Sequence, residues 1–281
     1  MRVMIDTFGG LCNQMMDIRA AVSFCVRYKL CFTFRHASLR ESCLTQWRDI
    51  PFSGLFDEQY FHDHLPTLYL PCPDPIPMEE LVNAEGQHAL ALWGHPSDAD
   101  LYQILVEKCE SHPHTNPWIL LRQFWCVFDW VYCLPMDPPS ALHLTLLMDM
   151  IRESLLPPRY NFLHYRYEHD FTEFFNITCP RLDDLLHSID FKEPDLPLYI
   201  GTDRTHLPTE FQELFRSSMI LHKDTVLDTV KDLDLNYEEK AFLDYRIGLG
   251  AVEVYGHSQS SFSHWLNNMH HTRNYYNEME K

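Results

Sequence analysis

The stretch RVMIDTFGGLCNQ, residues 2–14, decides the fold, because it joins a short apolar segment to a glycine pair and the start of a helical pattern. Residues 2–6 alternate weakly and predict a strand, and apolar residues recur near helical spacing over residues 13–28. Residues 30–34 predict a second strand. A strand, a glycine turn, a helix and a strand in this order predict the opening of a Rossmann-like half.

The second half of the chain repeats this alternation. A helix over residues 141–155 ends before Pro157 and Pro158, which cannot continue it, and we expect the domain boundary there. Beyond it, strands are predicted at 161–167, 198–201, 219–221 and 252–255, and helices at 181–189, 208–216, 237–249 and from Ser260 onward. The pattern predicts parallel sheets covered on both faces, with ligands beyond the carboxyl ends of the strands.

The middle of the chain gives a weaker signal. Residues 63–117 are rich in Pro, His and Asp and predict irregular loops and short helices. Residues 118–134 are the most apolar stretch, but Arg122, Gln123 and Asp129 interrupt it, so we expect a buried or partly amphipathic helix and no membrane span.

Length and charge exclude several classes of protein. A chain of 281 residues is long for one compact core and comfortable for two. Its formal net charge of −18 repels nucleic acid and anionic lipid, so neither is an expected partner. The nine cysteines are odd in number and irregularly spaced, which favours free thiols in a reducing compartment. Without a recognisable signal peptide, we expect a cytoplasmic protein.

The segment His164-Tyr165-Arg166-Tyr167-Glu168-His169-Asp170 carries the strongest chemical signal, because it ends a predicted strand with polar groups. Side chains alternate along a strand, so His164, Arg166 and Glu168 are expected on one face. A guanidinium can make two charge-assisted hydrogen bonds to a diphosphate. A structural ion pair between Arg166 and Glu168 explains the pattern equally well.

Three further segments combine glycine, hydroxyl or acidic residues with strand ends or helix starts. They are Gly9-Gly10-Leu11-Cys12-Asn13-Gln14, Tyr199-Ile200-Gly201-Thr202-Asp203-Arg204 and Gly256-His257-Ser258-Gln259-Ser260-Ser261-Phe262-Ser263. Glycine lets a backbone approach a ligand, and a helix start offers free N–H groups to an anion. A turn, a loop and a helix cap, respectively, are the simpler interpretations.

Taken together, the four segments resemble the O-fucosyltransferase-like glycosyltransferases. That family combines a GG-x-x-NQ turn, an H-x-R-x-E-x-D strand, a strand ending near T-D and a late S-S-F, in the order found here. The resemblance implies a GT-B fold, with two Rossmann-like domains facing a central cleft. Residues 1–157 would form the acceptor domain and residues 158–281 the nucleotide-sugar donor domain.

The resemblance also implies roles for individual residues. Arg166 would bind the β-phosphate of the donor and assist its departure, and His164 would shape the donor pocket. Ser260, Ser261 and Phe262 would contact phosphate and nucleoside, and Asp203 would lie on the same donor side. Gly9, Gly10 and Asn13 would lie at the acceptor side.

One departure from the family pattern leaves the donor open. Relatives carry an acid that binds guanine just before the last strand, where this chain has Val252 followed by Glu253. Glu253 is the candidate substitute, so the resemblance implies GDP-fucose, while UDP-xylose or another UDP-sugar is the alternative. The partners expected are a nucleotide-sugar and a glycan or glycoprotein acceptor, with no further cofactor.

The expected reaction is an inverting transfer without metal, because Arg166 and a helix N-terminus can neutralise the leaving diphosphate. The candidate bases for the acceptor hydroxyl are Asp6, Glu168 and Asp170.

Two other functions remain open. Asp98-Ala99-Asp100 and Asp232-Leu233-Asp234 would suit a metal-dependent transferase, although 40 acidic residues produce such pairs by chance. A binding module without catalysis is the other alternative. A cytoplasmic enzyme of this kind would suit a bacterium or a large virus that builds its own glycans.

Overall fold

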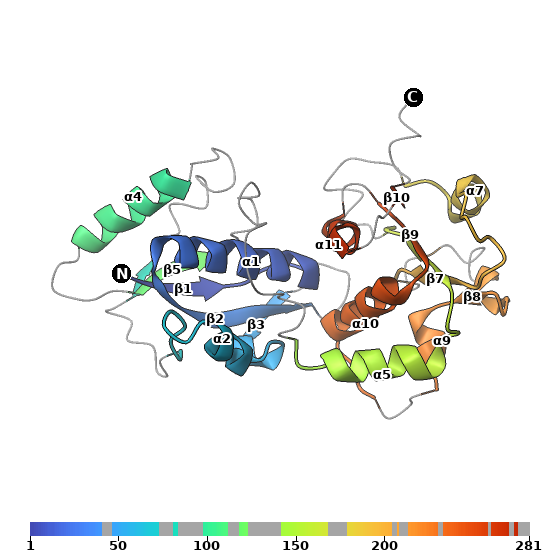
Figure 1. The fold of residues 1–281 in the computed structure, drawn as a ribbon, viewed down its shortest axis with the longest axis horizontal. Helices are drawn as coiled ribbons and strands as arrows, with labels where there is room; N and C mark the ends of the chain where they lie inside the picture. The colour runs from blue at the N-terminus through green and yellow to red at the C-terminus, as the bar shows by residue number, and fades with distance from the viewer. Residues whose placement is uncertain are drawn as a thin grey trace. The chain divides into compact units, whose positions relative to one another are not determined.

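The computed structural model describes residues 1–40, 47–72, 81–83, 98–111, 118–122, 142–167, 179–203, 207, 213–229, 233–257, 260–269 and 273–274. Contacts divide the chain into two compact units (Figure 1). The first comprises Met1–Leu39 with Trp47–His143, and the second comprises Arg40–Gln46 with Leu144–Lys281. This division places α5 (Thr145–Leu155) in the second unit, ahead of the predicted boundary after residue 157.

The first unit is built on a five-stranded sheet in the order β3-β2-β1-β5-β4. The central strand β1 pairs in parallel with β2 and β5, and β5 pairs in parallel with β4. The strands are β1 (Arg2–Asp6), β2 (Cys31–Arg40), β3 (Trp47–Pro51), β4 (Leu81–Asn83) and β5 (Trp118–Arg122). The strand predicted at residues 2–6 is confirmed, and the one predicted at 30–34 continues six residues further, to Arg40.

The prediction of a helix over residues 118–134 is wrong for residues 118–122. Residues 118–122 form β5, and Ile119 and Leu121 are buried in the sheet. A strand covered on both faces has a continuous apolar sequence, which periodicity cannot distinguish from a buried helix. Residues 123–134 lie outside the described residues. In the stretch expected to be irregular, α4 (Asp98–Glu110) is a helix of 13 residues.

Aromatic packing holds the first unit around β2. Phe34 on β2 stacks on Phe52 of the 3-10 helix η1 (Phe52–Gly54), with ring centroids 4.1 Å apart, and contacts Phe61 of α2 (Glu58–His64) at 4.7 Å. Figure 1 shows α1 (Leu11–Tyr28) and α2 on opposite sides of β1 and β2.

The second unit contains a second sheet of five strands, in the order β10-β9-β6-β7-β8. All four strand pairs are parallel. Its strands are β6 (Asn161–His164), β7 (Leu198–Gly201), β8 (Ile220–Leu221), β9 (Glu253–Gly256) and β10 (Arg273–Asn274). The chain runs from β6 outward to β8, then returns to place β9 on the other side of β6. The strand order therefore reverses between β6 and β9, which is where parallel sheets bind ligands.

Helices cover both faces of this sheet. Leu163 and Tyr165 pack with Leu182 and Leu185 of α7 (Leu182–Ser188) on one face. Phe162 points to the other face, where Gly248 of α10 (Tyr237–Gly250) allows Leu266 of α11 (Ser261–Met269) to approach closely. The predicted strands of this half are all present, within a few residues at their ends. The remaining described helices are α9 (Lys223–Leu227) and the 3-10 helix η8 (Leu214–Arg216).

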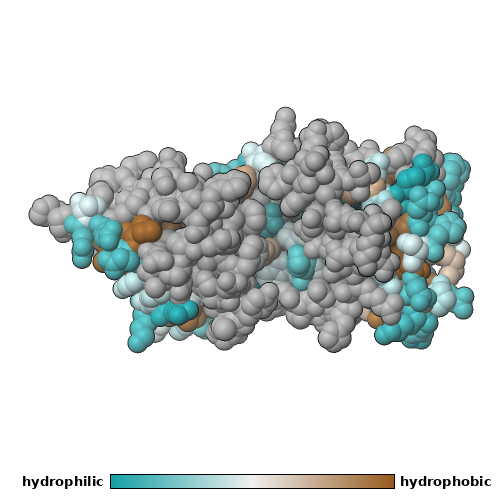
Figure 2. Space-filling view, turned by 90° about the horizontal axis from the view of Figure 1, so that it is seen from above, coloured by the Kyte–Doolittle hydropathy of each residue, from teal (hydrophilic) through white to brown (hydrophobic). Residues whose placement is uncertain are grey.

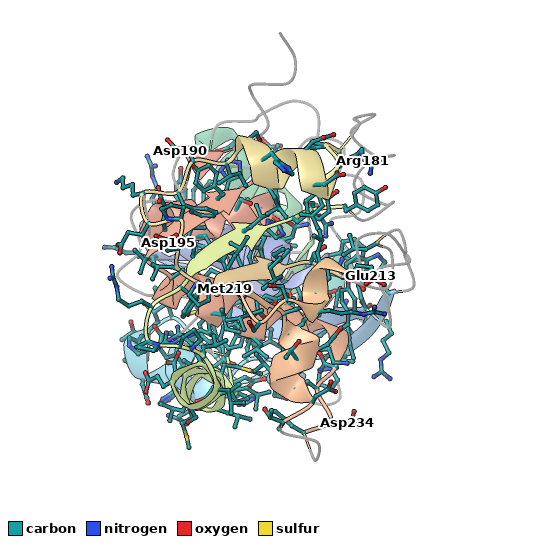
Figure 3. All side chains as sticks on the ribbon, turned by 90° about the vertical axis from the view of Figure 1, so that its right-hand side faces the viewer. Arg181, Asp190, Asp195, Glu213, Met219 and Asp234 are labelled. Atoms are coloured by element: carbon teal, nitrogen blue, oxygen red, sulfur yellow. The ribbon has the colours of Figure 1, made fainter. Side chains whose placement is uncertain are left out.

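On the face drawn in Figure 2, most of the coloured residues are hydrophilic. Figure 3 shows Asp190, Asp195, Glu213 and Asp234 spread around the periphery of the second unit, not gathered at one point. In Figure 2, hydrophobic areas are small and border hydrophilic ones. Among the described residues, none of the helices is both long and apolar enough to cross a bilayer.

Candidate functional site

In the second unit, the carboxyl end of β6 meets the start of α11. His164 ends β6 and is buried, and its Nδ1 lies 2.8 Å from Ser263 Oγ. The Phe262 ring lies over the imidazole, with ring centroids 4.3 Å apart. Residues almost one hundred positions apart in the chain thus form one cluster at the switch point between β6 and β9.

Arg166, two residues beyond β6, dominates the electrostatics of this cluster. Burial, followed by the charge of Arg166 and by repulsion from His257 when it is protonated and from Lys223, holds the pKa of His164 well below its usual range. Burial and the Arg166 charge also lower the pKa of His257, which follows β9, to about 4. Both imidazoles are therefore neutral near pH 7, while the guanidinium stays charged.

The alternation predicted beyond β6 is present in the described part of the segment. The Tyr165 and Tyr167 rings stack with centroids 5.5 Å apart, and the Tyr165 hydroxyl donates to the Pro180 carbonyl at 2.8 Å. His164 lies on the other side, against Ser263 and Phe262 of α11, and the Arg166 charge acts on it. Glu168 and Asp170 lie outside the described residues, so their predicted roles stay predictions.

The serine turn at the start of α11 contacts His257, on which the Arg166 charge acts. Ser260 is buried, its N–H donates to the His257 carbonyl at 3.1 Å, and its own carbonyl accepts from His264 N at 3.0 Å. Ser261 begins α11 and Phe262 follows in its first turn. The structure therefore brings together Arg166, His164, Phe262 and Ser260 from the predicted set. The cluster also contains His257 and Ser263. Both come from the same serine-rich stretch of the sequence as Ser260, but no role was predicted for them from the sequence.

The two predicted acidic residues of the donor side have different positions. Asp203 follows the carboxyl end of β7, and its carboxylate accepts from the Tyr237 hydroxyl at 3.3 Å. Glu253 starts β9 and accepts from Lys192 N at 2.8 Å. Because β9 runs in parallel with β6, Glu253 lies at the opposite end of the sheet from Arg166. The structure does not bring Glu253 into the cluster.

A buried ionic network that the sequence did not reveal supports the end of β7. Lys223 Nζ donates to Asp244 Oδ2 at 2.6 Å and to the Thr202 carbonyl at 2.7 Å. The Tyr199 hydroxyl donates to Asp244 Oδ1 at 2.7 Å, and burial followed by the Asp244 charge raises the Tyr199 pKa. The network fixes the backbone immediately before Asp203.

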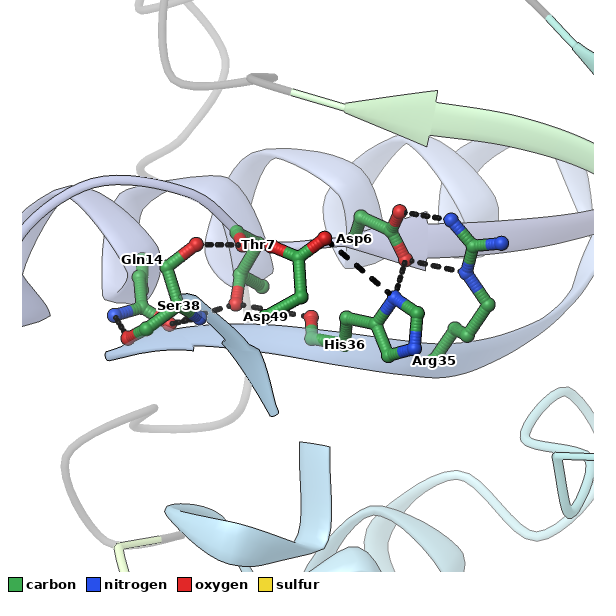
Figure 4. A network of polar contacts seen from close by, with 7 residues as sticks. All are labelled: Asp6, Thr7, Gln14, Arg35, His36, Ser38 and Asp49. Carbon is green, nitrogen blue, oxygen red and sulfur yellow. Dashed lines mark hydrogen bonds and ion pairs between the residues drawn. The ribbon is translucent and has the colours of Figure 1, made fainter. Parts of the chain in front are cut away.

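In the first unit, the glycine turn after β1 is held by a second polar network (Figure 4). Thr7 Oγ1 donates to Gln14 Oε1 at 2.9 Å, and the Gln14 amide donates to the carbonyls of Ser38 and Gly9. Gly9 has a φ of 90°, and a Cβ at this position would lie 3.0 Å from Asn13 Nδ2. Gly9, Gly10 and Asn13 thus form one rigid turn at the carboxyl end of β1.

Asp6, one of the candidate bases, is buried and paired with an arginine. Arg35 Nε donates to Asp6 Oδ1 at 2.9 Å, and Arg35 Nη2 binds Oδ2 (Figure 4). The carboxylate is buried and faces the imidazole of His36, whose Nδ1 is 3.8 Å from Oδ1. Arg35 and His36 were not singled out from the sequence, because they occur within a strand that continues beyond its predicted end.

The described residues contain no group of three or more His, Cys, Asp or Glu arranged to hold a metal. Asp98 and Asp100 lie in the first turn of α4 and not at a strand end. Asp232 lies outside the described residues.

Comparison with known proteins supports the fold. No family model matches the chain, and no curated protein matches it in sequence. Among solved structures, it is similar to POFUT1 in complex with GDP-fucose, with a TM-score of 0.59, 12% identity, and coverage of 98% of this chain and 97% of the other. It is also similar to the α-1,6-fucosyltransferase NodZ soaked with GDP-fucose, with a TM-score of 0.50, 12% identity, and coverage of 95% of this chain and 92% of the other. The chain therefore has an α/β fold of the GT-B type with two Rossmann-like units, and resembles fucosyltransferases at the level of the fold.

Proposed function

We propose that the protein is a glycosyltransferase that moves a sugar from a nucleotide-sugar to a hydroxyl of a glycan or glycoprotein, with inversion and without metal. The observation that supports this most directly is the position of Arg166. Its charge acts on two neutral imidazoles, one of which contacts a buried serine turn, at the switch point of a sheet whose solved structural neighbour holds GDP-fucose.

In this proposal, each residue of the cluster has a role that fits its environment. Arg166 binds the diphosphate with its planar fork and stabilises the charge that develops as the bond to the sugar breaks. His164 is held by Ser263 and packed under Phe262, so it shapes the pocket as a neutral group. Ser260 and Ser261 lie at the start of α11, where N–H groups favour an anion.

GDP-fucose is the donor that we propose first, with UDP-xylose or another UDP-sugar as the alternative. The position of Glu253 at the amino end of β9 removes it as a guanine contact at the carboxyl end of the sheet. Asp203 remains as the acidic candidate near the donor, held by Tyr237. The unit that carries these residues is the donor side, and the unit with Gly9, Gly10 and Asn13 is the acceptor side.

The test is a thermal-shift screen of the whole chain with GDP, UDP, GDP-fucose and UDP-xylose. A ligand present at 100 times its dissociation constant stabilises the folded protein by about 2.7 kcal/mol. The correct donor should therefore raise the melting temperature by a measurable amount. The donor that binds is then incubated with the protein, and release of the nucleoside diphosphate is followed with and without EDTA.

The expected result is one preferred nucleotide class and slow release of nucleoside diphosphate that EDTA does not affect. Binding without release indicates a binding module. Release that EDTA abolishes indicates a metal-dependent transferase. If none of the four compounds shifts the melting temperature, the proposal is wrong.

A further inference from the structure

The acceptor side of the first unit contains an irregularity next to Asp6. Strand register pairs Ile5 with Phe34 and Asp6 with His36, so Arg35 is an extra residue on β2. A bulge of this kind re-aims the side chains of the bulged strand and is common beside active sites. Here it allows two consecutive basic residues, Arg35 and His36, to reach one carboxylate.

The two basic residues contact Asp6 in different ways. Arg35 binds both carboxylate oxygens, and its side chain is only 15% exposed. Both oxygens of the buried Asp6 carboxylate are therefore engaged by one guanidinium, which leaves Asp6 poorly placed to contact a substrate hydroxyl.

The imidazole of His36 is better placed. Its side chain is 35% exposed, and its Nδ1 is buried and faces two carboxylates, Asp6 Oδ1 at 3.8 Å and Asp49 Oδ2 at 4.0 Å. The other ring nitrogen, Nε2, lies on the side of the ring away from Asp6 and Asp49 (Figure 4). A carboxylate facing one ring nitrogen favours the proton on that nitrogen and leaves the other free to accept one.

We propose that His36 is the base that accepts the proton of the acceptor hydroxyl, and that Asp6 and Asp49 orient its ring. The inference rests on the proposed function. In the transfer step, the hydroxyl oxygen bonds to the anomeric carbon of the sugar, and the bond from that carbon to the diphosphate breaks. The electron pair leaves with the nucleoside diphosphate, and the hydroxyl proton passes to His36 Nε2, giving an imidazolium stabilised by the two carboxylates.

The central experiment compares His36→Gln with His62→Gln. His62 on α2 is a matched control, because it also lies beside an aspartate, with its Nδ1 3.6 Å from Asp63 Oδ1, but its side chain is 54% exposed on the surface. The measurement is kcat/KM for transfer to an acceptor as a function of pH, together with the melting-temperature shift caused by the donor. A spectroscopic check that each variant is folded accompanies both.

His36→Gln is expected to lower kcat/KM by about 10²-fold or more, the usual contribution of a general base, and to remove the fall in rate on the acidic side. The shift caused by the donor should be unchanged, because the donor residues belong to the second unit. His62→Gln should behave as the unaltered protein in both measurements.

Asp49→Asn gives a second, independent readout. The charged groups that contact or flank the ring among the described residues are Asp6 on β1, Arg35 on β2 and Asp49 on β3. The Asp49 side chain is 44% exposed, so its substitution should not disturb folding. Loss of this carboxylate disfavours the imidazolium, and the acidic fall in rate should move to lower pH.

The inference is overturned if His36→Gln transfers at the normal rate, or if it keeps the acidic fall while Asp49→Asn abolishes it. The latter result makes Asp49 the base. If the unaltered protein neither binds nor transfers a nucleotide-sugar, the proposed function fails and this inference fails with it. Normal transfer by the unaltered protein with no effect of His36→Gln refutes the role of His36 alone.

Discussion

At the scale of single residues, Arg166 and His257 have linked properties. Each lies just beyond a strand end, and the guanidinium charge adds to burial in keeping the imidazole neutral. An anion bound at Arg166 would offset that charge and make the imidazolium less unfavourable. The pair therefore reports on occupancy of the proposed diphosphate site.

Arg166→Ala is expected to reduce the rate of sugar transfer about 10²-fold or more, because it removes the group that we propose as the main electrostatic stabiliser of the leaving diphosphate. It should also raise the pKa of His257, since one cause of its lowering is lost. Steady-state kinetics and NMR titration of the imidazole check the two effects. Arg181→Ala is the control, because Arg181 is exposed and pairs with Asp183. Near-normal turnover in Arg166→Ala would refute the role of this residue.

Gly9→Ala is expected to destabilise the protein by about 1–2 kcal/mol, because a φ of 90° is strained for any residue with a Cβ. The added carbon also approaches Asn13, so acceptor transfer should fall more than donor binding. Gly10→Ser is the comparison, since Gly10 has a φ of −60° and Ser is a favourable N-cap. Urea unfolding of both variants measures the difference, and equal stabilities would contradict the prediction.

At the scale of elements, α1 connects the glycine turn to the second strand of the first sheet. Its end is set by Lys29, which has φ 54° and ψ 44° and donates its N–H to the carbonyls of Cys25 and Val26. This left-handed position is usually occupied by glycine. Lys29 therefore adopts a strained left-handed conformation, and β2 begins only two residues later, at Cys31.

Lys29→Gly is expected to stabilise the protein by about 0.5–1 kcal/mol, because relief of the left-handed strain exceeds the added entropy of glycine in the unfolded chain. Thermal unfolding gives the measurement. Arg27→Gly is the control, because Arg27 lies inside the last helical turn, where glycine costs about 1 kcal/mol. A lower melting temperature for Lys29→Gly would show that the side chain contributes more than its strain costs.

At the scale of the whole molecule, the two buried imidazoles of the second unit link stability to pH. Their pKa values are lowered in the folded protein, so the unfolded chain binds more protons below pH 6.5. The stability that they contribute is complete above that pH. It is lost as the pH falls from 6.5 through the folded pKa values, which for His257 is about 4.

His257→Asn should therefore make the protein less sensitive to acid. Between pH 7 and pH 5, the free energy of unfolding should fall by about 2 kcal/mol less in this variant than in the unaltered protein. Urea unfolding at the two pH values measures this difference. His187→Gln, which removes an exposed imidazole on α7, is the control and should leave the dependence unchanged. If the free energy of unfolding depended on pH equally in His257→Asn and in the unaltered protein, the lowered pKa of His257 would be contradicted.

The sequence by itself determined the alternation of strands and helices in the second unit, the first strand and helix, and the cluster of polar residues at strand ends. These follow from local patterns: the strand at residues 198–201 is present as predicted, and Tyr165 alternates with His164 and Arg166 because side chains alternate along any extended segment. The same patterns led to the resemblance, and the structural neighbours agree with the fold that it implied.

Only the tertiary structure decided that residues 118–122 form a strand between β1 and β4, that Glu253 lies away from Arg166, and that Asp6 is shared by Arg35 and His36. The physical reason is common to all three. Each depends on which strand lies beside which, on strand direction and on one bulge in register. These are set by the packing of segments far apart in the chain, which no local periodicity records.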